Sequence, residues 1–447
     1  MEAVICLAAI YGAVEIRLNS MRFYSESLNS ELLHLKAILF SVVMVTIMSA
    51  MGLYQAQMRE GLIGYLLRLA ASFLLSLVGL SLIFYAFPDM FLGRGILIIA
   101  FAISFLGMII TRKLVLTIDP EVFKKRIIVL GAGERASTIT QLRRKADQVG
   151  FNIIGFLHIR GEADLVDKKR IINIDSPLHD FAKEHDIDEI VLAVDDRRKG
   201  FPMHELLDCK MRGVDVVDVQ TFFERETGKI RVDLLQPSWL VFSDGFRQSA
   251  LRDYTKRGFD IFSSLLLLSI TWPFMLLAII AITLESGIKA PILFRQVRVG
   301  EGGKPFQVLK FRSMRVDAEK NGRAIWATKN DSRVTRVGAF IRKVRIDELP
   351  QIINVLKGDM SFVGPRPERP EFVVDLSDRI PYYQERHHMK PGITGWAQLC
   401  YPYGSSERDA LEKLQYDLYY VKNYSLFLDF LILLRTAEVV LFGKGAR

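Results

Sequence analysis

The sequence has 447 residues, too many for one ordinary hydrophobic core, and combines 50% hydrophobic with 24% charged residues. The apolar residues are concentrated before about Leu116, which argues against a uniformly soluble protein. The net charge is +9, and fifteen lysines and arginines stand against four acidic residues in 289–346, which indicates an anionic partner. The isolated cysteines Cys6, Cys209 and Cys400 argue against a disulfide framework and a paired-cysteine metal site.

Residues 1–115 are predicted to form a transmembrane bundle of about four helices, because the apolar segments approach the roughly 20 residues needed to cross a bilayer. The first segment is short, since Glu15 and Arg17 follow it, and it lacks the basic start and cleavage site of a signal peptide. Arg112 and Lys113 follow the last segment and place its end in the cytoplasm by the positive-inside rule. The four segments are Ala3–Val14, Leu35–Leu53, Leu66–Phe87 and Gly95–Ile110.

Residues 116–250 are predicted to form a Rossmann-like α/β domain with a parallel, doubly wound sheet, since short apolar runs alternate with helical stretches. The run Arg126–Leu130 leads into Gly131–Ala136, a G-x-G-x-x-A turn, and a helical stretch then continues to Val149. Further strands are expected at Asn152–Leu157, Glu189–Ala193 and Asp215–Val219.

The glycine-rich turn has two interpretations. It has the context of a dinucleotide-binding fingerprint, but His158 and Arg160 stand where an acidic residue would bind a ribose. The block also has no Tyr-x-x-x-Lys pair. A tight structural turn, or a site for an unidentified regulator, is therefore favoured. An NAD-dependent nucleotide-sugar oxidoreductase or dehydratase is kept as an alternative function.

Residues 251–447 begin near the uncharged apolar run Ile261–Leu284, which Pro273 interrupts. The run is long enough to span a bilayer, but cations flank it on both sides, which assigns both ends to the cytoplasm. We therefore expect a re-entrant helix over 257–285, kinked at Pro273, with Ser269 and Thr271 bonding carbonyls that the kink frees. The flanking cations are Arg252, Lys256, Arg257, Lys289, Arg295 and Arg298.

Three basic residues are candidates for phosphate binding. Lys310 and Arg312 are two apart in the predicted strand Phe306–Met314, so both project from one face, where two cations suit a diphosphate. A solvated basic edge explains them equally well. Arg366 lies between two prolines in Gly364–Pro367, which stiffens its backbone and suits a phosphate-binding guanidinium; a rigid surface turn is the alternative.

The acidic pair Asp347 and Glu348 carries the strongest signal. Both fall at the start of a helix that Gly358 is placed to end, and Pro350 is tolerable in its first turn. Helix capping alone explains acidic residues at such a position. Arg342 just upstream, together with the helix N-terminus, would however hold a phosphate beside the carboxylates.

Two later features carry weaker signals. The adjacent His387 and His388 lack partners at the spacing of a zinc site, so a metal centre is disfavoured there. The segment Pro391–Trp396 is a loop whose aromatic side chain fits base stacking or lipid contact as well as a packed structural turn.

From Lys256 to Arg447 the sequence resembles the bacterial sugar transferases, the monotopic polyprenyl-phosphate phosphoglycosyl transferases. Each matching segment alone is unspecific, but the ordered set is highly specific. The apolar bundle and the Rossmann-like block resemble the large form of this family, which initiates exopolysaccharide or O-antigen synthesis, by architecture rather than by motif. The main matching segments are Lys256–Asp260, Phe294–Gln296, Lys310–Met314, Asp331–Thr335, Asp347–Gln351, Asn354–Gly358, Val363–Glu368 and Lys390–Trp396.

The resemblance implies an enzyme that moves a sugar 1-phosphate from a UDP-sugar, UDP-glucose or UDP-galactose at the family level, to undecaprenyl phosphate. Asp347 would attack the sugar-bearing phosphorus, release UMP and form an aspartyl-phosphosugar, which the polyprenyl phosphate then attacks. Mg²⁺ bound by Asp347 and Glu348 would offset the negative charge together with basic side chains. The implied phosphate-binding residues are Lys310, Arg312, Arg342 and Arg366.

The fold expected from these observations is a membrane α-helical bundle, a Rossmann-like α/β domain and an α/β monotopic catalytic domain with a re-entrant helix. The resemblance places the chain in the bacterial inner membrane with the catalytic domain facing the cytoplasm, and a homodimer is left open. A membrane-tethered nucleic-acid-binding protein is a second alternative, disfavoured because the basic stretch has no recognisable nucleic-acid motif. Neither alternative predicts UMP release from a UDP-sugar.

Overall fold

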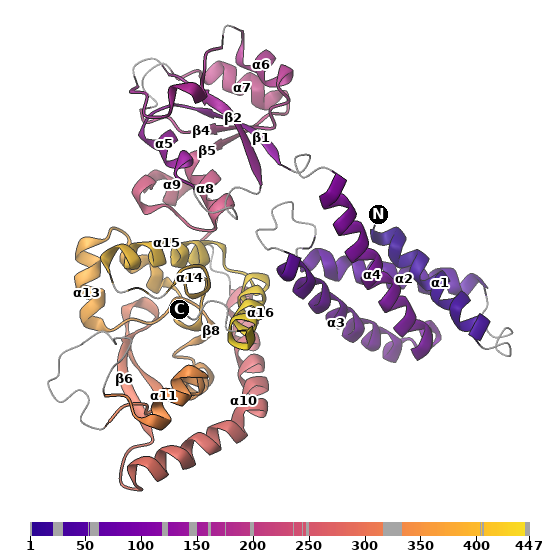
Figure 1. Ribbon diagram of the computed structural model, residues 1–447, viewed down its shortest axis with the longest axis vertical. Coiled ribbons are helices and arrows are strands. Elements are labelled where there is room, and N and C mark those ends of the chain that lie inside the picture. Colours follow the sequence, from indigo (N-terminus) through magenta and orange to yellow (C-terminus); the bar gives the residue numbers. More distant parts are fainter. Residues whose placement is uncertain are drawn as a thin grey trace. The chain divides into compact units, whose positions relative to one another are not determined.

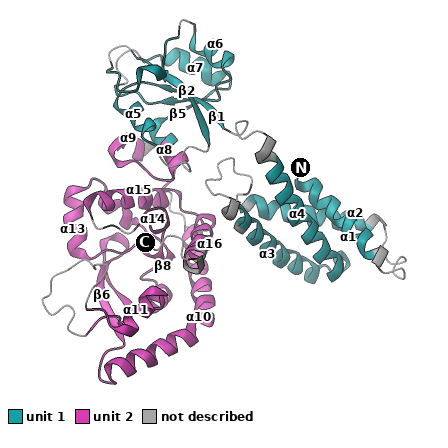
Figure 2. Cartoon of the chain, in the orientation of Figure 1, with its two compact units in different colours: residues 1–222 teal, residues 223–447 magenta. Residues whose placement is uncertain are grey.

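The protein is described here by a computed structural model, which divides into two compact units. Figure 2 shows these units, residues 1–222 and residues 223–447. The described residues are 2–20, 30–51, 53, 62–118, 124–142, 150–159, 162–174, 176–196, 201–235, 237–243, 245–246, 250–315, 333–402, 404 and 406–442.

Four helices form where the apolar segments predicted them (Figure 1). α1 packs on α2 and α4, and α2 packs on α3. By length and composition α2, α3 and α4 can each cross a membrane, with apolar windows Leu32–Ser49, Arg68–Ala86 and Arg94–Leu114. α1, the segment expected to be short, does not meet that criterion. The helices are α1 (Glu2–Ser20), α2 (Ser30–Ala50), α3 (Leu62–Ala86) and α4 (Arg94–Ile118), with the 3-10 turn η1 (Pro88–Met90) before α4.

The predicted parallel sheet is confirmed, with strand order β3-β2-β1-β4-β5 and every pair parallel. The two-residue strand β3 escaped sequence analysis because it is too short to show a pattern. Helices α6 and α7 pack apolar side chains against β1 and β4 in one buried core. The elements are β1 (Lys125–Leu130), α5 (Glu134–Thr140), β2 (Phe151–Leu157), η3 (Lys168–Arg170), β3 (Ile171–Ile172), α6 (Leu178–Glu184), β4 (Glu189–Leu192), α7 (Met203–Met211), β5 (Asp215–Asp218) and α8 (Val219–Thr227).

The glycine-rich turn between β1 and α5 is closed by a carboxylate of the protein itself. Asp195 accepts hydrogen bonds from the backbone N–H groups of Glu134 and Arg135, at 2.8 and 2.9 Å. A Cβ on Gly133 would lie 2.0 Å from Asp195 Oδ2, so only glycine permits this contact. A dinucleotide fingerprint would offer these N–H groups to a pyrophosphate. The contact therefore favours the structural interpretation of the turn; Arg160 lies outside the described residues.

The second unit combines a long helix, two small sheets and a group of helices. β6 and β7 form an antiparallel hairpin, and β8 and β9 form a parallel pair. The elements are η4 (Val232–Leu234), α9 (Pro237–Phe242), α10 (Ala250–Ser286), β6 (Leu293–Val299), η5 (Glu301–Gly303), β7 (Pro305–Phe311), α11 (Arg336–Lys343), η6 (Ile346–Glu348), α12 (Gln351–Lys357), β8 (Ser361–Val363), α13 (Pro370–Arg379), η7 (Tyr383–His388), β9 (Gly392–Thr394), α14 (Trp396–Cys400), α15 (Glu407–Asn423) and α16 (Leu426–Phe442).

Two buried charged side chains near the start of helix α10 fix it to the core, and the rest of the helix presents an apolar surface. Lys256 Nζ lies 2.6 Å from Asp429 Oδ2, and Asp260 Oδ1 accepts from Ser361 Oγ and the Phe362 N–H at 2.9 and 2.8 Å. After these anchors the helix exposes large apolar side chains along its length, and its segment Arg252–Ser286 is long and apolar enough to cross a membrane by length and composition. The exposed side chains include Ile261, Phe262, Leu265, Leu266, Ile270, Trp272, Phe274, Leu276, Leu277, Ile280 and Leu284.

Pro273 lies inside α10, and Figure 1 shows this helix bent. Proline removes the N–H that would bond the Ser269 carbonyl, which explains a bend at this region. Ser269 and Thr271 do not bond that carbonyl as expected; their hydroxyls donate to Leu266 O and Leu267 O instead. A hydroxyl on a helix reaches back three or four residues, and both side chains precede the proline. The return of α10 to its side of entry stays a prediction.

Candidate active site

The acidic pair lies in η6, between α11 and α12. Arg345, just before this turn, has a left-handed backbone with φ 62°, a conformation that costs a non-glycine residue about 1 kcal/mol. Asp347 and Glu348 lie in a separate 3-10 turn ahead of α12, and neither caps that helix, because its N-cap residue is Pro350 and no side chain among the described residues bonds the first N–H groups. Gly358, with φ 94°, ends α12 as predicted.

Two side chains hold α12 in place behind the acidic pair. Asn354 Oδ1 accepts from the Leu309 N–H at 3.0 Å, and its Nδ2 donates to Gln307 O at 2.7 Å, which fixes the helix to β7. Arg257 of α10 donates to the last carbonyls of α12, those of Val355 and Leu356, at 2.5 and 2.7 Å. The sequence did not predict either role. In the sequence Arg257 is one of the cations that flank the apolar run, and Asn354 is the first residue of a segment that resembles the family.

Glu348 is held as an ion by two cations from separate elements. Lys310 Nζ of β7 lies 2.9 Å from Glu348 Oε1, and Arg366 Nη2, after β8, lies 3.6 Å from the same oxygen. Burial raises the pKa of Glu348, but Lys310 and Arg366 outweigh it and hold that pKa at about 2. Burial lowers the pKa of Lys310, against the opposing effect of Glu348. The group is a partly buried ion pair whose carboxylate is fixed in place.

Asp347 has the opposite environment. Burial, and then the neighbouring charge of Glu348, raise the pKa of Asp347 to about 6, while Lys310, Arg342 and Arg345 act against the rise. Within the described residues its carboxylate accepts no hydrogen bond. Asp347 is thus ionised at neutral pH, poorly solvated and without a hydrogen-bond donor, which suits a nucleophile or a metal ligand.

The remaining predicted phosphate-binding residues take different positions. Arg342 is half-buried on α11, and its charge acts on Asp347. The strand predicted to reach Met314 ends at Phe311, so Arg312 lies just beyond β7. Arg312 is buried, and neither terminal nitrogen of its guanidinium has a hydrogen-bond partner among the described residues. A solvated basic edge is therefore the wrong interpretation for Arg312, while a role in anion binding stays a prediction.

The donor chemistry of the acidic pair fits Mg²⁺, which prefers oxygen ligands and is commonly held by one or two carboxylates together with substrate phosphates. Asp347 and one oxygen of Glu348 are such donors, since the other Glu348 oxygen is taken by Lys310. Across the described part of the chain no three or more His, Cys, Asp or Glu side chains are grouped as metal ligands. A cation held here would therefore depend on substrate phosphate as well.

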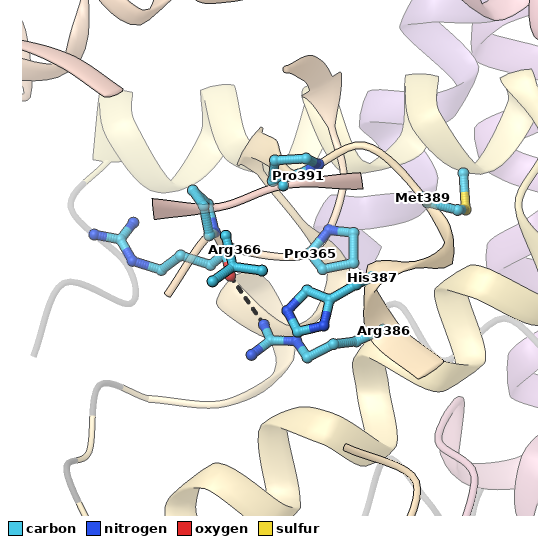
Figure 3. Close-up of a pocket in the computed structure, with 9 residues that line it drawn as sticks. Pro365, Arg366, Arg386, His387, Met389 and Pro391 are labelled. Atoms are coloured by element: carbon cyan, nitrogen blue, oxygen red, sulfur yellow. Dashed lines mark hydrogen bonds between the residues drawn. The ribbon is translucent and has the colours of Figure 1, made fainter. Parts of the chain in front are cut away.

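The loop Gly364–Pro367 places Arg366 beside Glu348. The same loop lines a small pocket, which Figure 3 shows. A Cβ on Gly364 would lie 2.4 Å from Lys390 O, so glycine is needed for this close backbone approach. Trp396 is buried and its Nε1 donates to Gly228 O at 2.8 Å. The packed interpretation of Trp396 is therefore the correct one. The pocket is lined by Val299, Gly300, Pro365, Arg366, Pro367, Arg386, His387, Met389 and Pro391.

Comparison with known proteins extends these observations. The family model described as bacterial sugar transferase matches residues 251–443, and one described as CoA-binding domain matches residues 49–200. The chain is 35% identical over 332 residues to a UDP-glucose:undecaprenyl-phosphate glucose-1-phosphate transferase of Klebsiella pneumoniae, covering 72% of this chain and 69% of that protein. It is 31% identical over 352 residues to an undecaprenyl-phosphate galactose phosphotransferase of Salmonella typhimurium, covering 73% and 70%.

A further relative matches over a shorter region. The chain is 43% identical over 242 residues to a UDP-N-acetylgalactosamine-undecaprenyl-phosphate N-acetylgalactosaminephosphotransferase of Aeromonas hydrophila, covering 54% of this chain. This match spans 56% of the Aeromonas protein. A separate match, to a glucose-1-phosphate transferase of Xanthomonas campestris, spans 36% of that protein.

Proposed function

The chain is a member of the bacterial sugar transferase family, and we propose that it moves a sugar 1-phosphate from a UDP-sugar to undecaprenyl phosphate. One observation of the site carries the proposal. Two adjacent carboxylates have opposite environments, Glu348 fixed between two cations and Asp347 buried, with no hydrogen-bond donor among the described residues. Such a pair divides the work between a nucleophile and a charged support. The names of the relatives support the same donor and acceptor classes.

In the proposed reaction, Asp347 attacks the phosphorus that carries the sugar. The new bond joins an aspartate oxygen to that phosphorus, and the bond from the phosphorus to the bridging oxygen breaks, so that UMP leaves with the electron pair. An oxygen of undecaprenyl phosphate then attacks the same phosphorus. The acyl phosphate bond breaks, the lipid diphosphate sugar forms and the Asp347 carboxylate is restored.

Both substrates are anions that approach an anion, so the site must offset negative charge. Arg366 and Lys310 neutralise Glu348, and Arg342 acts on Asp347. A substrate phosphate that displaces Glu348 as partner of Arg366 would be bound at little additional desolvation cost, and the buried Arg312 offers further donors. Bound Mg²⁺, held by Asp347 and Glu348, would supply further stabilisation of the charge on the transferred phosphoryl group.

The proposed place of the reaction is the cytoplasmic face of a bacterial membrane, as the initiating membrane step of exopolysaccharide or O-antigen synthesis. UDP-sugars are cytosolic, whereas the polyprenyl acceptor is held in the bilayer. A re-entrant α10 would keep the sites for both on one side, since the acidic pair follows α10 in sequence and α10 is anchored to the same unit.

The proposed activity is tested with purified protein, undecaprenyl phosphate and a panel of UDP-glucose, UDP-galactose and their N-acetylated counterparts. We expect Mg²⁺-dependent release of UMP with one preferred sugar, glucose or galactose, and no requirement for NAD(H) or NADP(H). Release of UDP in place of UMP, or strict dependence of turnover on a nicotinamide cofactor, would contradict the proposal. Loss of activity with a chelator and its return with added Mg²⁺ checks the metal.

The topology of α10 gives a separate prediction. Single cysteines replace the exposed Tyr254, before the apolar run, and Lys304, after it, in a chain that lacks Cys6, Cys209 and Cys400. If α10 re-enters, an impermeant thiol reagent labels neither position in intact spheroplasts, and both after permeabilisation.

The matched control for labelling is Asp89→Cys. Asp89 lies exposed in the turn between α3 and α4, which the positive-inside rule places outside, so it is expected to label in intact spheroplasts. Labelling of Lys304→Cys together with Asp89→Cys, but not of Tyr254→Cys, would mean that α10 spans the membrane.

The raised pKa of Asp347 predicts the pH dependence of the first half-reaction. A protonated carboxyl is no nucleophile, so the rate is expected to rise with pH through about 6, the pKa to which burial and then Glu348 raise Asp347. The measurement is the burst of UMP release from pH 4.5 to 8 without undecaprenyl phosphate, which removes the titration of the acceptor. A rise centred near 4, the ordinary range of an aspartate, would contradict this environment for Asp347.

A further inference from the structure

The backbone of the Arg366 loop is held by a second arginine. Arg386 Nη2 donates to the carbonyl oxygen of Arg366 at 2.9 Å, and Figure 3 shows that carbonyl facing the Arg386 guanidinium. Arg386 lies in η7 and is buried. It also donates through Nη1 to Tyr383 Oη at 2.8 Å and pairs with the buried Asp417 of α15, with Nη2 to Oδ2 at 2.7 Å.

We propose that Arg386, held by Asp417, is a positioning residue that fixes the Arg366 backbone and thereby keeps the Arg366 guanidinium beside Glu348 and the transferred phosphate. The inference rests on the proposed function. The prolines on either side of Arg366 restrict φ in the loop, but they do not set where the loop lies relative to η6. The hydrogen bond from the buried Arg386 guanidinium ties the Arg366 carbonyl to η7, next to a backbone hydrogen bond from the Gly392 N–H to Pro365 O.

The other end of the loop is anchored in the same way. The carbonyl of Val363, just before the loop, accepts from Lys256 Nζ at 3.2 Å and from Tyr420 Oη at 3.0 Å. The Gly364 N–H donates to Thr394 O at 2.9 Å. With Arg386 on the Arg366 carbonyl, buried side chains hold both ends of a segment of four residues. The Arg366 side chain extends from this segment to Glu348.

Stability alone is a weak explanation for the Arg386–Asp417 pair. Removing two charges from water costs more than their attraction returns unless further hydrogen bonds satisfy them, and apolar replacements of such pairs are often as stable. In this pair the further hydrogen bonds go to Tyr383 and to the Arg366 carbonyl. Through Arg386 Nη2 the pair therefore constrains the Arg366 carbonyl, which a pair of apolar side chains would leave unconstrained.

The test compares two double variants that each remove one cation and one anion. Arg386→Gln with Asp417→Asn removes the buried pair without leaving a lone charge. Arg379→Gln with Asp375→Asn removes an exposed pair on α13, with 2.7 Å between its charged atoms. We expect the first to lower kcat/KM for the UDP-sugar by about tenfold or more, as a misplaced binding group does, and the second to change it less than about twofold.

A positioning role requires that the loss depend on Arg366. In an Arg366→Lys background, adding Arg386→Gln and Asp417→Asn is expected to lower kcat/KM for the UDP-sugar by less than a further factor of about two. The reason is that the Arg366 guanidinium, which Arg386 positions, is already absent. If Arg386 has a merely structural role, the reductions in kcat/KM from Arg366→Lys and from the double variant multiply. Either that result or an unchanged kcat/KM in the Arg386→Gln/Asp417→Asn variant would overturn the inference.

Two measurements keep the outcome readable. Thermal unfolding in detergent shows whether the double variant folds; if it does not, Arg386→Lys takes its place in the same cycle, since lysine keeps the charge but not the planar, forked donor geometry. Absence of UMP release in the unmodified protein would count against the proposed function itself, whereas release in the unmodified protein with fully multiplicative losses counts against the positioning role alone.

Discussion

Asp347→Asn is expected to lower UMP release by about 10⁴-fold or more, the size of loss that follows removal of a nucleophile. An amide has nearly the shape of the carboxylate but cannot form the acyl phosphate. Because Arg345, Lys310 and Glu348 define the site independently of the Asp347 charge, their arrangement should remain. The covalent intermediate gives a second readout, since unmodified protein should retain labelled sugar phosphate after denaturation when acceptor is withheld.

The same change is expected to leave the fold at least as stable. The pKa of Asp347 is about 6 in the folded protein, above its ordinary value of 3.8, so the folded state binds the proton more tightly than the unfolded state does. Stability from this group is present below pH 3.8 and is lost as pH rises through 6. At neutral pH the ionised carboxylate therefore destabilises the fold, by up to about 3 kcal/mol, and a neutral amide removes that cost.

The matched control is Asp378→Asn, an exposed carboxylate on α13. It should change neither UMP release nor the thermal unfolding midpoint. If purified Asp347→Asn retains more than a few per cent of the activity, Asp347 is not the nucleophile. If its thermal unfolding midpoint is lower than that of the unmodified protein, the buried Asp347 charge does not destabilise the fold.

Local signals made helix α12 predictable, but not the separate 3-10 turn that carries the acidic pair. Gly358 ends α12 because a left-handed residue is needed there, and a glycine after an apolar helical face shows this in the sequence. The parallel sheet was likewise visible, since each strand except β3 forms an apolar run of its own. Arg312 shows the limit of such reasoning, because the apolar pattern continued to Met314 while the pairing with β6 ended at Phe311.

Contacts between distant segments were not predictable from one sequence. Arg257 and Val355 are 98 positions apart, and Lys256 and Asp429 are 173 positions apart. Nothing local distinguishes these cations from the other charges that flank an apolar run. The same holds for Asp195 at the glycine-rich turn, which fills from 60 positions away the place that a ligand phosphate would take. Sequence patterns identified the acidic pair and its candidate cations, whereas the pairing of those cations with Glu348 comes from the fold.

Glu348→Gln is expected to lower UMP release by about 10²- to 10³-fold, the range for losing one charged group that supports a transition state. Glutamine keeps the side-chain shape but leaves Lys310 and Arg366 without the anion that holds them. Stability should change in the opposite direction to Asp347→Asn. The pKa of Glu348 is held at about 2, below its ordinary value of 4.5, so its stabilising contribution is present above 4.5 and is lost as pH falls through 2.

A control for this substitution is Glu371→Gln, which removes an exposed carboxylate that lies 3.6 Å from Arg369, the same distance that separates Arg366 from Glu348. Since the Glu371 carboxylate is exposed and well solvated, its loss should leave UMP release within about twofold. An equal loss of activity in both variants would mean that Glu348 has no special role.

The residual activity of Glu348→Gln also identifies which carboxylate sets the pH profile. The pKa values of Asp347 and of the buried Asp417 are both raised to about 6. A rate that rises with pH near 6 therefore does not by itself show which of the two carboxylates titrates. Replacing Glu348 by glutamine removes the second cause of the raised Asp347 pKa and leaves the charge of Lys310 without its partner. The Asp347 pKa should therefore fall, and the rate of UMP release should begin to rise at a lower pH. Glu348 is not among the groups that act on Asp417, whose pKa is raised by burial and then by Glu368 against the effect of Arg386. If the burst of UMP release from Glu348→Gln still rises with pH near 6, the titrating group is not Asp347. That result would contradict the division of roles within the acidic pair.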